Sequence, residues 1–218
     1  MRNLRHLTPR YIWNRIFWKI YHRRYPFAPY LNAEITRHLE NLIHPNHVGL
    51  EPGSGASTVW FAQRCGHLTS IEHDPAWAQR VSDWLRERNL FDKVDMKLCE
   101  RGPKGTPESY VDSIAAFSDN SLDFILIDGK KRDSCAIASL PRLKPGGHII
   151  VDDVHRYIAN DTPSHAPYSR GPTDGDASLK WEKFVDQTKI WPRLWKSDGI
   201  SDTAIWTKPI AKDTQQRL

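Results

Sequence analysis

Between residues 47 and 154 the chain alternates short apolar segments with segments of helical periodicity, and this alternation restricts the possible folds more than any other feature. HVGLEP at 47–52 and HLTSIEH at 67–73 read as strands, and STVWFAQRC at 57–65 reads as a helix between them. LDFILIDG at 122–129 is almost entirely apolar, which is typical of a strand buried on both faces. Strands that alternate with helices predict a doubly wound α/β fold, in which a mostly parallel sheet lies between two layers of helices.

The other elements follow from the same periodicities. Seven strands are expected, at 47–52, 67–73, 94–100, 122–129, 146–153, 193–198 and 203–208. Helices are expected near 11–22, 32–43, 57–65, 75–89, 109–116, 132–140 and 178–189. Lys144-Pro145-Gly146-Gly147 is expected to form a turn before the fifth strand. Residues 155–177 are rich in Pro, Gly, Ser and Asp, and a connection of that length inside a domain is usually a lid, a binding loop or disordered.

With 218 residues the chain suits one α/β domain and a short extension. We expect a basic, aromatic, helical extension at 1–33, the main domain at 34–210 and a polar tail at 211–218. The three cysteines form no C-x-x-C pair, and we expect a reducing, cytoplasmic setting. No run of about 18 apolar residues predicts a membrane-spanning helix.

The net charge of +5 is unevenly distributed. Residues 1–33 carry seven Lys or Arg and no Asp or Glu, so the remainder has 24 basic and 26 acidic residues, a net charge of −2. A nucleic-acid-binding protein would need a basic face on the folded domain. The charge distribution therefore argues against a nucleic-acid partner.

The basic extension contains one strongly patterned helix, YIWNRIFWKIYH at 11–22. The simpler expectation is that its Trp13, Phe17 and Ile20 pack on the domain or across a homodimer. The alternative is peripheral membrane contact through residues 1–24, because a helix with basic and aromatic faces suits an anionic membrane surface.

The first strand of the main domain runs into a Gly-rich turn, Glu51-Pro52-Gly53-Ser54-Gly55. Two glycines permit a tight turn and close approach of a ligand, although a plain structural turn has the same pattern. Glu72 ends the second strand 21 residues after Glu51, where a carboxylate can accept hydrogen bonds from a ribose. Thr58 stands where dinucleotide-binding turns usually have a third glycine. The pattern therefore favours a ligand with a ribose and a cationic amino group over one with a pyrophosphate.

The stretch EPGSGAST…SIEHDPAW…LDFILIDG…LKPGGHIIVDD resembles the Rossmann-like class I S-adenosylmethionine-dependent methyltransferases, and most of all small bacterial members of that family. The resemblance covers residues 47–154 and implies an enzyme that transfers a methyl group from S-adenosylmethionine. It implies that Glu51, Gly53 and Gly55 line the methionine end of the cofactor and that Glu72 holds the ribose. His73, Cys99 and Glu100 would then lie near the adenine. The complete expected cofactor set is Glu51, Gly53, Ser54, Gly55, Ser57, Thr58, Glu72, His73, Cys99, Glu100, Asp128 and Gly129.

Acidic residues end the fourth and fifth strands, at Asp128 and at Asp152-Asp153. Three carboxylates in one pocket repel one another unless a cation or a shared proton compensates, and Mg²⁺ prefers oxygen ligands. The pattern also resembles the metal-dependent sugar O-methyltransferases, which implies that Asp128, Asp152 and Asp153 bind a metal and that Asp128 is the base. Those enzymes usually have Asp-His after the Asp-Gly pair, where this chain has Lys130-Lys131. A lysine there neutralises the acids without a metal, and His155 then becomes a candidate general base.

The expected acceptor is a small hydroxylated metabolite or sugar. A nucleic-acid or protein methyltransferase is an alternative, although strand four lacks the Asp/Asn-Pro-Pro-aromatic run of enzymes that methylate exocyclic amines. An NAD-dependent oxidoreductase and a non-catalytic Rossmann-like binding protein are further alternatives. No Tyr in the chain has a Lys four residues later, so the short-chain dehydrogenase pattern is absent.

Overall fold

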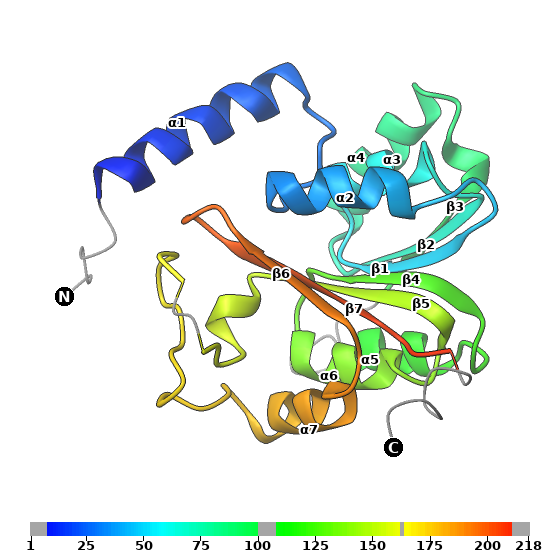
Figure 1. The fold of residues 1–218 in the computed structure, drawn as a ribbon. Helices are drawn as coiled ribbons and strands as arrows, with labels where there is room; N and C mark the ends of the chain where they lie inside the picture. The colour runs from blue at the N-terminus through cyan, green and yellow to red at the C-terminus, as the bar shows by residue number, and fades with distance from the viewer. Residues whose placement is uncertain (1–7, 100–107, 162–163, 211–218) are drawn as a thin grey trace.

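A computed structural model describes residues 8–99, 108–161 and 164–210 (Figure 1). Within these residues a seven-stranded sheet has the strand order β3-β2-β1-β4-β5-β7-β6. The strands are β1 (Val48–Pro52), β2 (His67–Glu72), β3 (Val94–Leu98), β4 (Leu122–Ile127), β5 (Leu143–Asp152), β6 (Arg193–Ser197) and β7 (Asp202–Thr207). The helices are α1 (Pro9–Arg24), α2 (Ala33–Leu42), α3 (Ala56–Ala62), α4 (Pro75–Arg86), α5 (Glu108–Ala115), α6 (Arg132–Ser139) and α7 (Leu179–Thr188), with 3₁₀ turns η1 (Phe91–Lys93) and η2 (Val154–Arg156).

The sheet confirms the predicted doubly wound, mostly parallel α/β fold. Strands β1 to β5 pair in parallel, and β7 pairs antiparallel with both β5 and β6. The chain leaves β1 toward β2 on one side and later returns to β1 from the other side as β4. The strand order therefore reverses between β1 and β4, and ligands of such sheets bind at the carboxyl ends of the strands beside this point.

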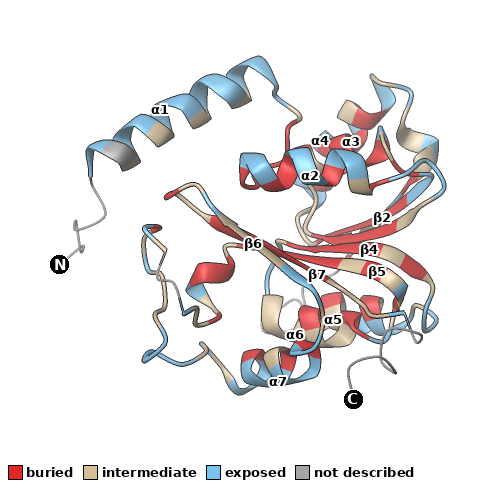
Figure 2. Cartoon of the chain, in the orientation of Figure 1, coloured by how far each residue is buried: buried red, intermediate tan, exposed pale blue. Residues whose placement is uncertain are grey.

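Two hydrophobic cores hold helices against opposite faces of the sheet (Figure 2). One core includes Ile35, Val59 and Val81 from α2, α3 and α4. The other includes Cys135 of α6 and Phe184 of α7. All of these side chains are buried, and each large apolar side chain removed from water stabilises the fold by roughly 1.5 to 3 kcal/mol.

Side-chain caps explain where three of the helices begin. Asn32 Oδ1 accepts hydrogen bonds from the backbone N–H groups of residues 34 and 35 at the start of α2. Asp74 Oδ1 does the same for residues 76 and 77 at the start of α4, where Pro75 occupies the first helical position as predicted. Ser178 caps α7 through the N–H of Trp181. These caps satisfy backbone donors that would otherwise lack partners.

One predicted turn is wrong, because β5 begins at Leu143 and includes Lys144-Pro145-Gly146-Gly147. A register shift between Leu122 and Phe124 in the pairing with β4 accommodates these residues. Gly146 takes a φ of +82° and donates its N–H to the carbonyl of Lys208 at 2.8 Å. A bulge therefore keeps the Pro-Gly-Gly run inside the strand instead of ending it.

Helix α1 lies at the edge of the domain (Figure 1). The expectation that Trp13, Phe17 and Ile20 pack on the domain is wrong, since these residues are 60%, 62% and 58% exposed. Their packing across a homodimer stays a prediction. Among the described residues, no helix is both long and apolar enough to cross a bilayer.

The described parts of the segment after β5 are folded against the domain. The N–H of Arg170 donates to the carbonyl of His155 at 2.9 Å, and the N–H of Ala177 donates to the carbonyl of Tyr157 at 2.7 Å. Ile158 and Ala166 are buried. This segment therefore covers the carboxyl end of β5 with a fixed backbone path.

Candidate functional site

The carboxyl ends of four neighbouring strands meet at one edge of the sheet. β1 ends beside Glu51, β2 ends at Glu72, β4 is followed by Asp128 and β5 ends at Asp152. Glu51, Glu72 and Asp152 are buried. Buried carboxylates are rare unless they are paired, so their gathering at one edge marks the candidate functional site.

The two glycines of the turn after β1 differ in backbone conformation and in surroundings. Gly53 has a φ of +101°, and a Cβ there would lie 3.0 Å from the Cα of Gly129. Gly55 has an extended φ of 177°, and a Cβ there would meet only Ser57 Oγ at 4.0 Å. The fold therefore requires Gly53, whereas neither the backbone nor the packing requires a glycine at position 55. Because Gly55 has no Cβ, there is open space at the start of α3.

Glu51 stabilises the glycine turn by accepting hydrogen bonds from side-chain hydroxyl groups. Its Oε1 accepts a hydrogen bond from Ser57, and its Oε2 accepts hydrogen bonds from Thr58 Oγ1 at 2.6 Å and Ser70 Oγ at 3.2 Å. Thr58 Oγ1 in turn accepts the N–H of Gly55 at 2.9 Å. Burial raises the pKa of Glu51 to about 7, although the hydrogen bonds from Ser57 and Thr58 lower it. Both oxygens face the interior of the turn, so Glu51 positions the turn through hydroxyl groups.

Glu72 accepts hydrogen bonds from backbone N–H groups of two loops. Its Oε2 accepts the N–H of Ser54 at 3.1 Å, and its Oε1 accepts the N–H groups of His73 and Asp74 at 2.7 and 3.0 Å. Trp77 Nε1 donates to the carbonyl of Ser54 at 2.8 Å. Glu72 and Trp77 therefore fix the glycine turn to the end of β2.

His73 and Cys99 lie beside Glu72, and their predicted place near the adenine stays a prediction. His73 Nδ1 lies 2.6 Å from Glu72 Oε1 and 3.1 Å from the hydroxyl of Tyr110. Cys99 is buried, and its N–H donates to the carbonyl of Glu72 at 2.6 Å. Glu100, the other residue predicted near the adenine, lies outside the described residues.

Arg132 unites the three aspartates at the ends of β4 and β5. Its Nη2 donates to Asp128 Oδ1 at 2.7 Å, and its Nη1 donates to the carbonyl of Asp152 at 2.5 Å. The same Nη1 lies 3.8 Å from Asp153 Oδ2. Asp153 Oδ1 also accepts a hydrogen bond from Ser201 Oγ at 3.0 Å. The guanidinium of Arg156 also lies 3.4 Å from Asp153 Oδ2, so Arg132 is the main counter-ion of this cluster and Arg156 adds to it at Asp153.

The aspartates differ in burial and in their affinity for a proton. Burial raises the pKa of Asp152 well above its usual range, and the negative charge of Asp128 raises it further. Burial also raises the pKa of Asp128, and Arg132 opposes that rise. The side chain of Asp128 is 33% exposed, whereas Asp152 is buried and accepts a hydrogen bond from Thr203 Oγ1 at 2.8 Å. Asp128 is therefore the accessible member of a carboxylate pair that favours keeping one proton.

The arrangement does not fit the predicted Mg²⁺ ligands. Within the described parts of the chain, no three His, Cys, Asp or Glu side chains are placed to hold a metal ion. The Arg132 guanidinium engages Asp128 Oδ1 and lies close to Asp153, so it provides the positive charge that a cation was expected to provide. The assignment of Asp128, Asp152 and Asp153 as metal ligands stays a prediction.

His155 follows β5 but is buried on the side of β7. Its Nδ1 accepts the N–H of Asp202 at 3.1 Å, so the neutral ring carries its proton on Nε2. Burial lowers its pKa, and the nearby carboxylate of Asp202 opposes that shift. A ring with its free lone pair already occupied does not favour the general-base role, which stays a prediction.

Sequence reasoning missed Arg132, Trp77 and Ser70. It considered Lys130 and Lys131 as counter-ions because they follow Asp128 directly. The available signal for Arg132 was its helical spacing, four residues after Asp128, which places two side chains on one face. Ser70 offered no comparable signal, because its contact with Glu51 depends on the register of β1 and β2.

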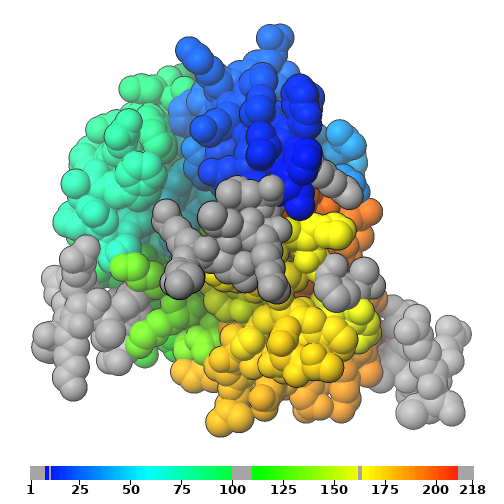
Figure 3. Space-filling view, turned by 90° about the vertical axis from the view of Figure 1, so that its left-hand side faces the viewer, coloured from blue at the N-terminus to red at the C-terminus, as the bar shows by residue number. Residues whose placement is uncertain are grey.

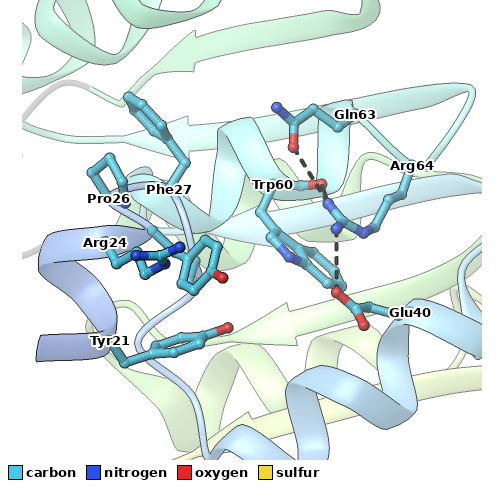
Figure 4. A pocket seen from close by; sticks show the side chains of 10 residues that line it. Tyr21, Arg24, Pro26, Phe27, Glu40, Trp60, Gln63 and Arg64 are labelled. Carbon is cyan, nitrogen blue, oxygen red and sulfur yellow. Dashed lines mark hydrogen bonds and ion pairs between the residues drawn. The ribbon is translucent and has the colours of Figure 1, made fainter. Parts of the chain in front are cut away.

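A pocket of about 540 Å³ lies elsewhere, among α1, α2 and α3 (Figure 4). The guanidinium of Arg64 lies 3.9 Å from the centre of the Trp60 ring and 3.3 Å from Glu40 Oε1. Arg64 and Glu40 in this pocket are therefore already paired with each other. None of the strand-end carboxylates lines the pocket.

A comparison with known protein families finds a match that covers the strand-end region. Residues 50–154 match a protein family described as a methyltransferase domain. This range includes the glycine turn, Glu72 and all three aspartates of the Arg132 cluster. No curated protein matches the chain in sequence.

Solved structures share the fold at low sequence identity. A protein from Corynebacterium glutamicum has a TM-score of 0.61 and 13% identity, with 90% of each chain covered. An O-methyltransferase from Bacillus cereus, in complex with S-adenosylhomocysteine, has a TM-score of 0.59 and 18% identity over 87% of this chain and 88% of that one. An O-methyltransferase of tomaymycin synthesis from Streptomyces achromogenes, in complex with S-adenosylmethionine, has a TM-score of 0.56 and 17% identity over 86% of each chain.

Proposed function

We propose that the chain is a class I methyltransferase that transfers the methyl group of S-adenosylmethionine to an oxygen atom of a small hydroxylated acceptor. The match of residues 50–154 to a methyltransferase-domain family supports this proposal. The O-methyltransferases among the structural neighbours support this choice of acceptor atom. The observation that carries the proposal is the placement of Asp128, a partly accessible carboxylate, beside buried Asp152 at the strand-order switch.

The glycine turn fits S-adenosylmethionine. The open space at Gly55, at the start of α3, supports binding of the amino-acid end there. The carboxylate of Glu72 ends β2 next to the turn and can accept hydrogen bonds from a ribose. Glu51 holds the turn in shape through Ser57 and Thr58. Pyrophosphate is a poor ligand for this end of β1, because Glu51 and Asp128 both lie there.

When bound, S-adenosylmethionine supplies a methyl group that its sulfonium already activates. The protein's main tasks are then to align the acceptor oxygen and to remove its proton. Asp128 is the candidate base, because its raised pKa brings it nearer to neutral pH and its side chain reaches solvent. Arg132 is the positioning residue that holds Asp128 and limits repulsion from Asp152 and Asp153.

The first test is calorimetric titration of S-adenosylmethionine and of NAD⁺ into the purified protein. We expect micromolar binding of S-adenosylmethionine alone and at least tenfold weaker binding in Glu72→Gln, since that change removes the ribose acceptor charge. Glu40→Gln is the matched control, because Glu40 lies on the surface away from the strand ends. Binding of NAD⁺ but not S-adenosylmethionine contradicts the proposal.

The second test screens hydroxylated aromatic compounds and sugars for release of S-adenosylhomocysteine. Asp128→Asn should lower kcat about 10²- to 10⁴-fold with little change in cofactor affinity, as expected for loss of a general base. Activity should survive a chelator, because Arg132 provides the positive charge beside Asp128. An activity that depends on Mg²⁺ contradicts the role given to Arg132 and supports the metal prediction.

A further inference from the structure

Helix α1 presents two chemically different faces. Asn14 Nδ2 donates to the carbonyl of Asp198 at 2.5 Å, and the Trp18 ring stacks on Tyr30 with centroids 5.2 Å apart. His22 lies one turn after Trp18, with its Nε2 3.3 Å from the carbonyl of Pro29. These side chains, spaced by four residues, form the inward face of the helix.

The opposite face is apolar and exposed. It consists of Ile12, Trp13, Ile16, Phe17 and Ile20, which we call the outward face of α1. Trp13 and Phe17 stack with ring centroids 5.8 Å apart and remain 60% and 62% exposed. A helix on the surface of a monomeric domain normally turns its apolar stripe inward. Here the stripe is largely exposed to solvent, although Phe17 and Ile20 also line a cavity between α1 and the domain. Contiguous exposed apolar surface of this kind marks an interaction site.

Positive charge surrounds the outward face. Arg15, Lys19, Arg23 and Arg24 are exposed along the same helix, and residues 1–33 contain no acidic side chain. Two copies of α1 packed face to face would bring like charges together without an acidic partner. An anionic lipid surface complements both the charge and the apolar stripe, because basic side chains extend to headgroups while aromatic and aliphatic ones enter the interface.

We propose that the outward face of α1 docks this protein on an anionic lipid surface, with the helix lying in the plane of the interface. Sixteen residues make a helix about 24 Å long, too short to cross a bilayer and long enough to lie on one.

The helix is attached at the same edge as the strand-end site. Asn14 binds the turn between β6 and β7, and Ser201 of that turn donates to Asp153. Figure 3 shows α1 in blue on the same face of the molecule as the segment after β5 in yellow. Docking through α1 therefore places the carboxyl edge of the sheet beside the lipid surface.

The test is co-sedimentation of the full chain with vesicles of phosphatidylcholine, alone or mixed with phosphatidylglycerol. We expect binding to the mixed vesicles only, weakened by high salt. Ile20→Ser should weaken binding severalfold, whereas Ile190→Ser, a control on another surface with 60% exposure against 58% for Ile20, should leave it unchanged. Lys19→Glu should weaken binding at least about fivefold, and Lys183→Glu on α7 is its control.

Three results overturn the proposal. One is no binding to anionic vesicles by a folded protein. Another is equal binding of the wild type and both α1 variants. The third is a dimer in light scattering that forms without lipid and that Ile20→Ser dissociates, since a second copy would then cover the outward face. The measurement needs no methyl acceptor, so its outcome is independent of the proposed reaction.

Discussion

The two halves of the strand-end site stabilise their acidic side chains in different ways. On the β1–β2 half, hydroxyl groups surround Glu51, and backbone N–H groups surround Glu72 together with the His73 ring. On the β4–β5 half, the guanidinium of Arg132 donates to the carboxylate of Asp128 and to the carbonyl of Asp152. Arg132 and Arg156 lie 3.8 and 3.4 Å from the carboxylate of Asp153. The first half relies on neutral hydrogen-bond donors, and the second relies mainly on the cation of Arg132.

This difference suits two different tasks. Many short bonds from backbone and hydroxyl donors fix the shape of a loop, which is what a cofactor cradle requires. A cluster of carboxylates beside a guanidinium keeps proton affinities adjustable, which is what acid–base chemistry requires. We therefore expect the β4–β5 half to be more sensitive to a single change of charge than the β1–β2 half.

The largest expected effect is that of Arg132→Met. Removing one partner from a mostly buried ion cluster leaves uncompensated charge, which costs about 3 to 5 kcal/mol. Urea denaturation at pH 7 should show this loss in the free energy of unfolding. The double change Asp128→Asn with Arg132→Met should recover part of the loss, because one negative charge is also removed. A loss below about 1 kcal/mol contradicts the view that Arg132 is the common counter-ion.

A second prediction concerns the pH dependence that Glu51 contributes. Its folded pKa of about 7 is raised above the ordinary value of 4.5, so the folded state holds the proton more tightly. This contribution to stability is fully present below pH 4.5 and is lost as the pH rises through 7. Glu51→Gln cannot ionise, so its stability relative to wild type should rise by up to about 3 kcal/mol between pH 5 and 8.

Denaturation of both proteins across that pH range measures the difference directly. Ile190→Ser should give a flat difference, because it changes an exposed residue without adding or removing an ionisable group. A flat difference for Glu51→Gln as well would mean that Glu51 is ionised throughout, and the two halves of the site would then be more alike than the structure indicates.

The smallest expected changes in stability distinguish the two glycines of the turn. Gly53→Ala places a Cβ at a φ of +101° and against Gly129, so it should destabilise the protein by about 1 to 3 kcal/mol. Gly55→Ala should change stability by less than about 0.5 kcal/mol, because its backbone is extended and its surroundings are open. Titration calorimetry should nevertheless show at least tenfold weaker S-adenosylmethionine binding for Gly55→Ala. Unchanged binding would mean that the open space at Gly55 is not part of the cofactor cradle.

Much of the fold was predictable because its signals are local. The alternation of strand and helix patterns gave all seven strands, and Pro75 after Asp74 marked the start of α4. The run Lys144-Pro145-Gly146-Gly147 misled the prediction, since a bulge that keeps such residues in a strand depends on the neighbouring strand. Packing of Trp13, Phe17 and Ile20 on the domain was also mispredicted, because periodicity shows that a helix has an apolar face and does not show which way that face points.

The sequence by itself determined the chemistry available at each strand end, since acidic residues and glycines after apolar segments are visible without coordinates. The match of residues 50–154 to a methyltransferase-domain family agrees with that assignment. Only the tertiary structure decided how these groups are paired. Hydrogen bonds from Ser70 to Glu51 and from Arg132 to the carbonyl of Asp152 join residues 19 and 20 positions apart. Such contacts depend on strand register and helix orientation, and a short segment of sequence encodes neither.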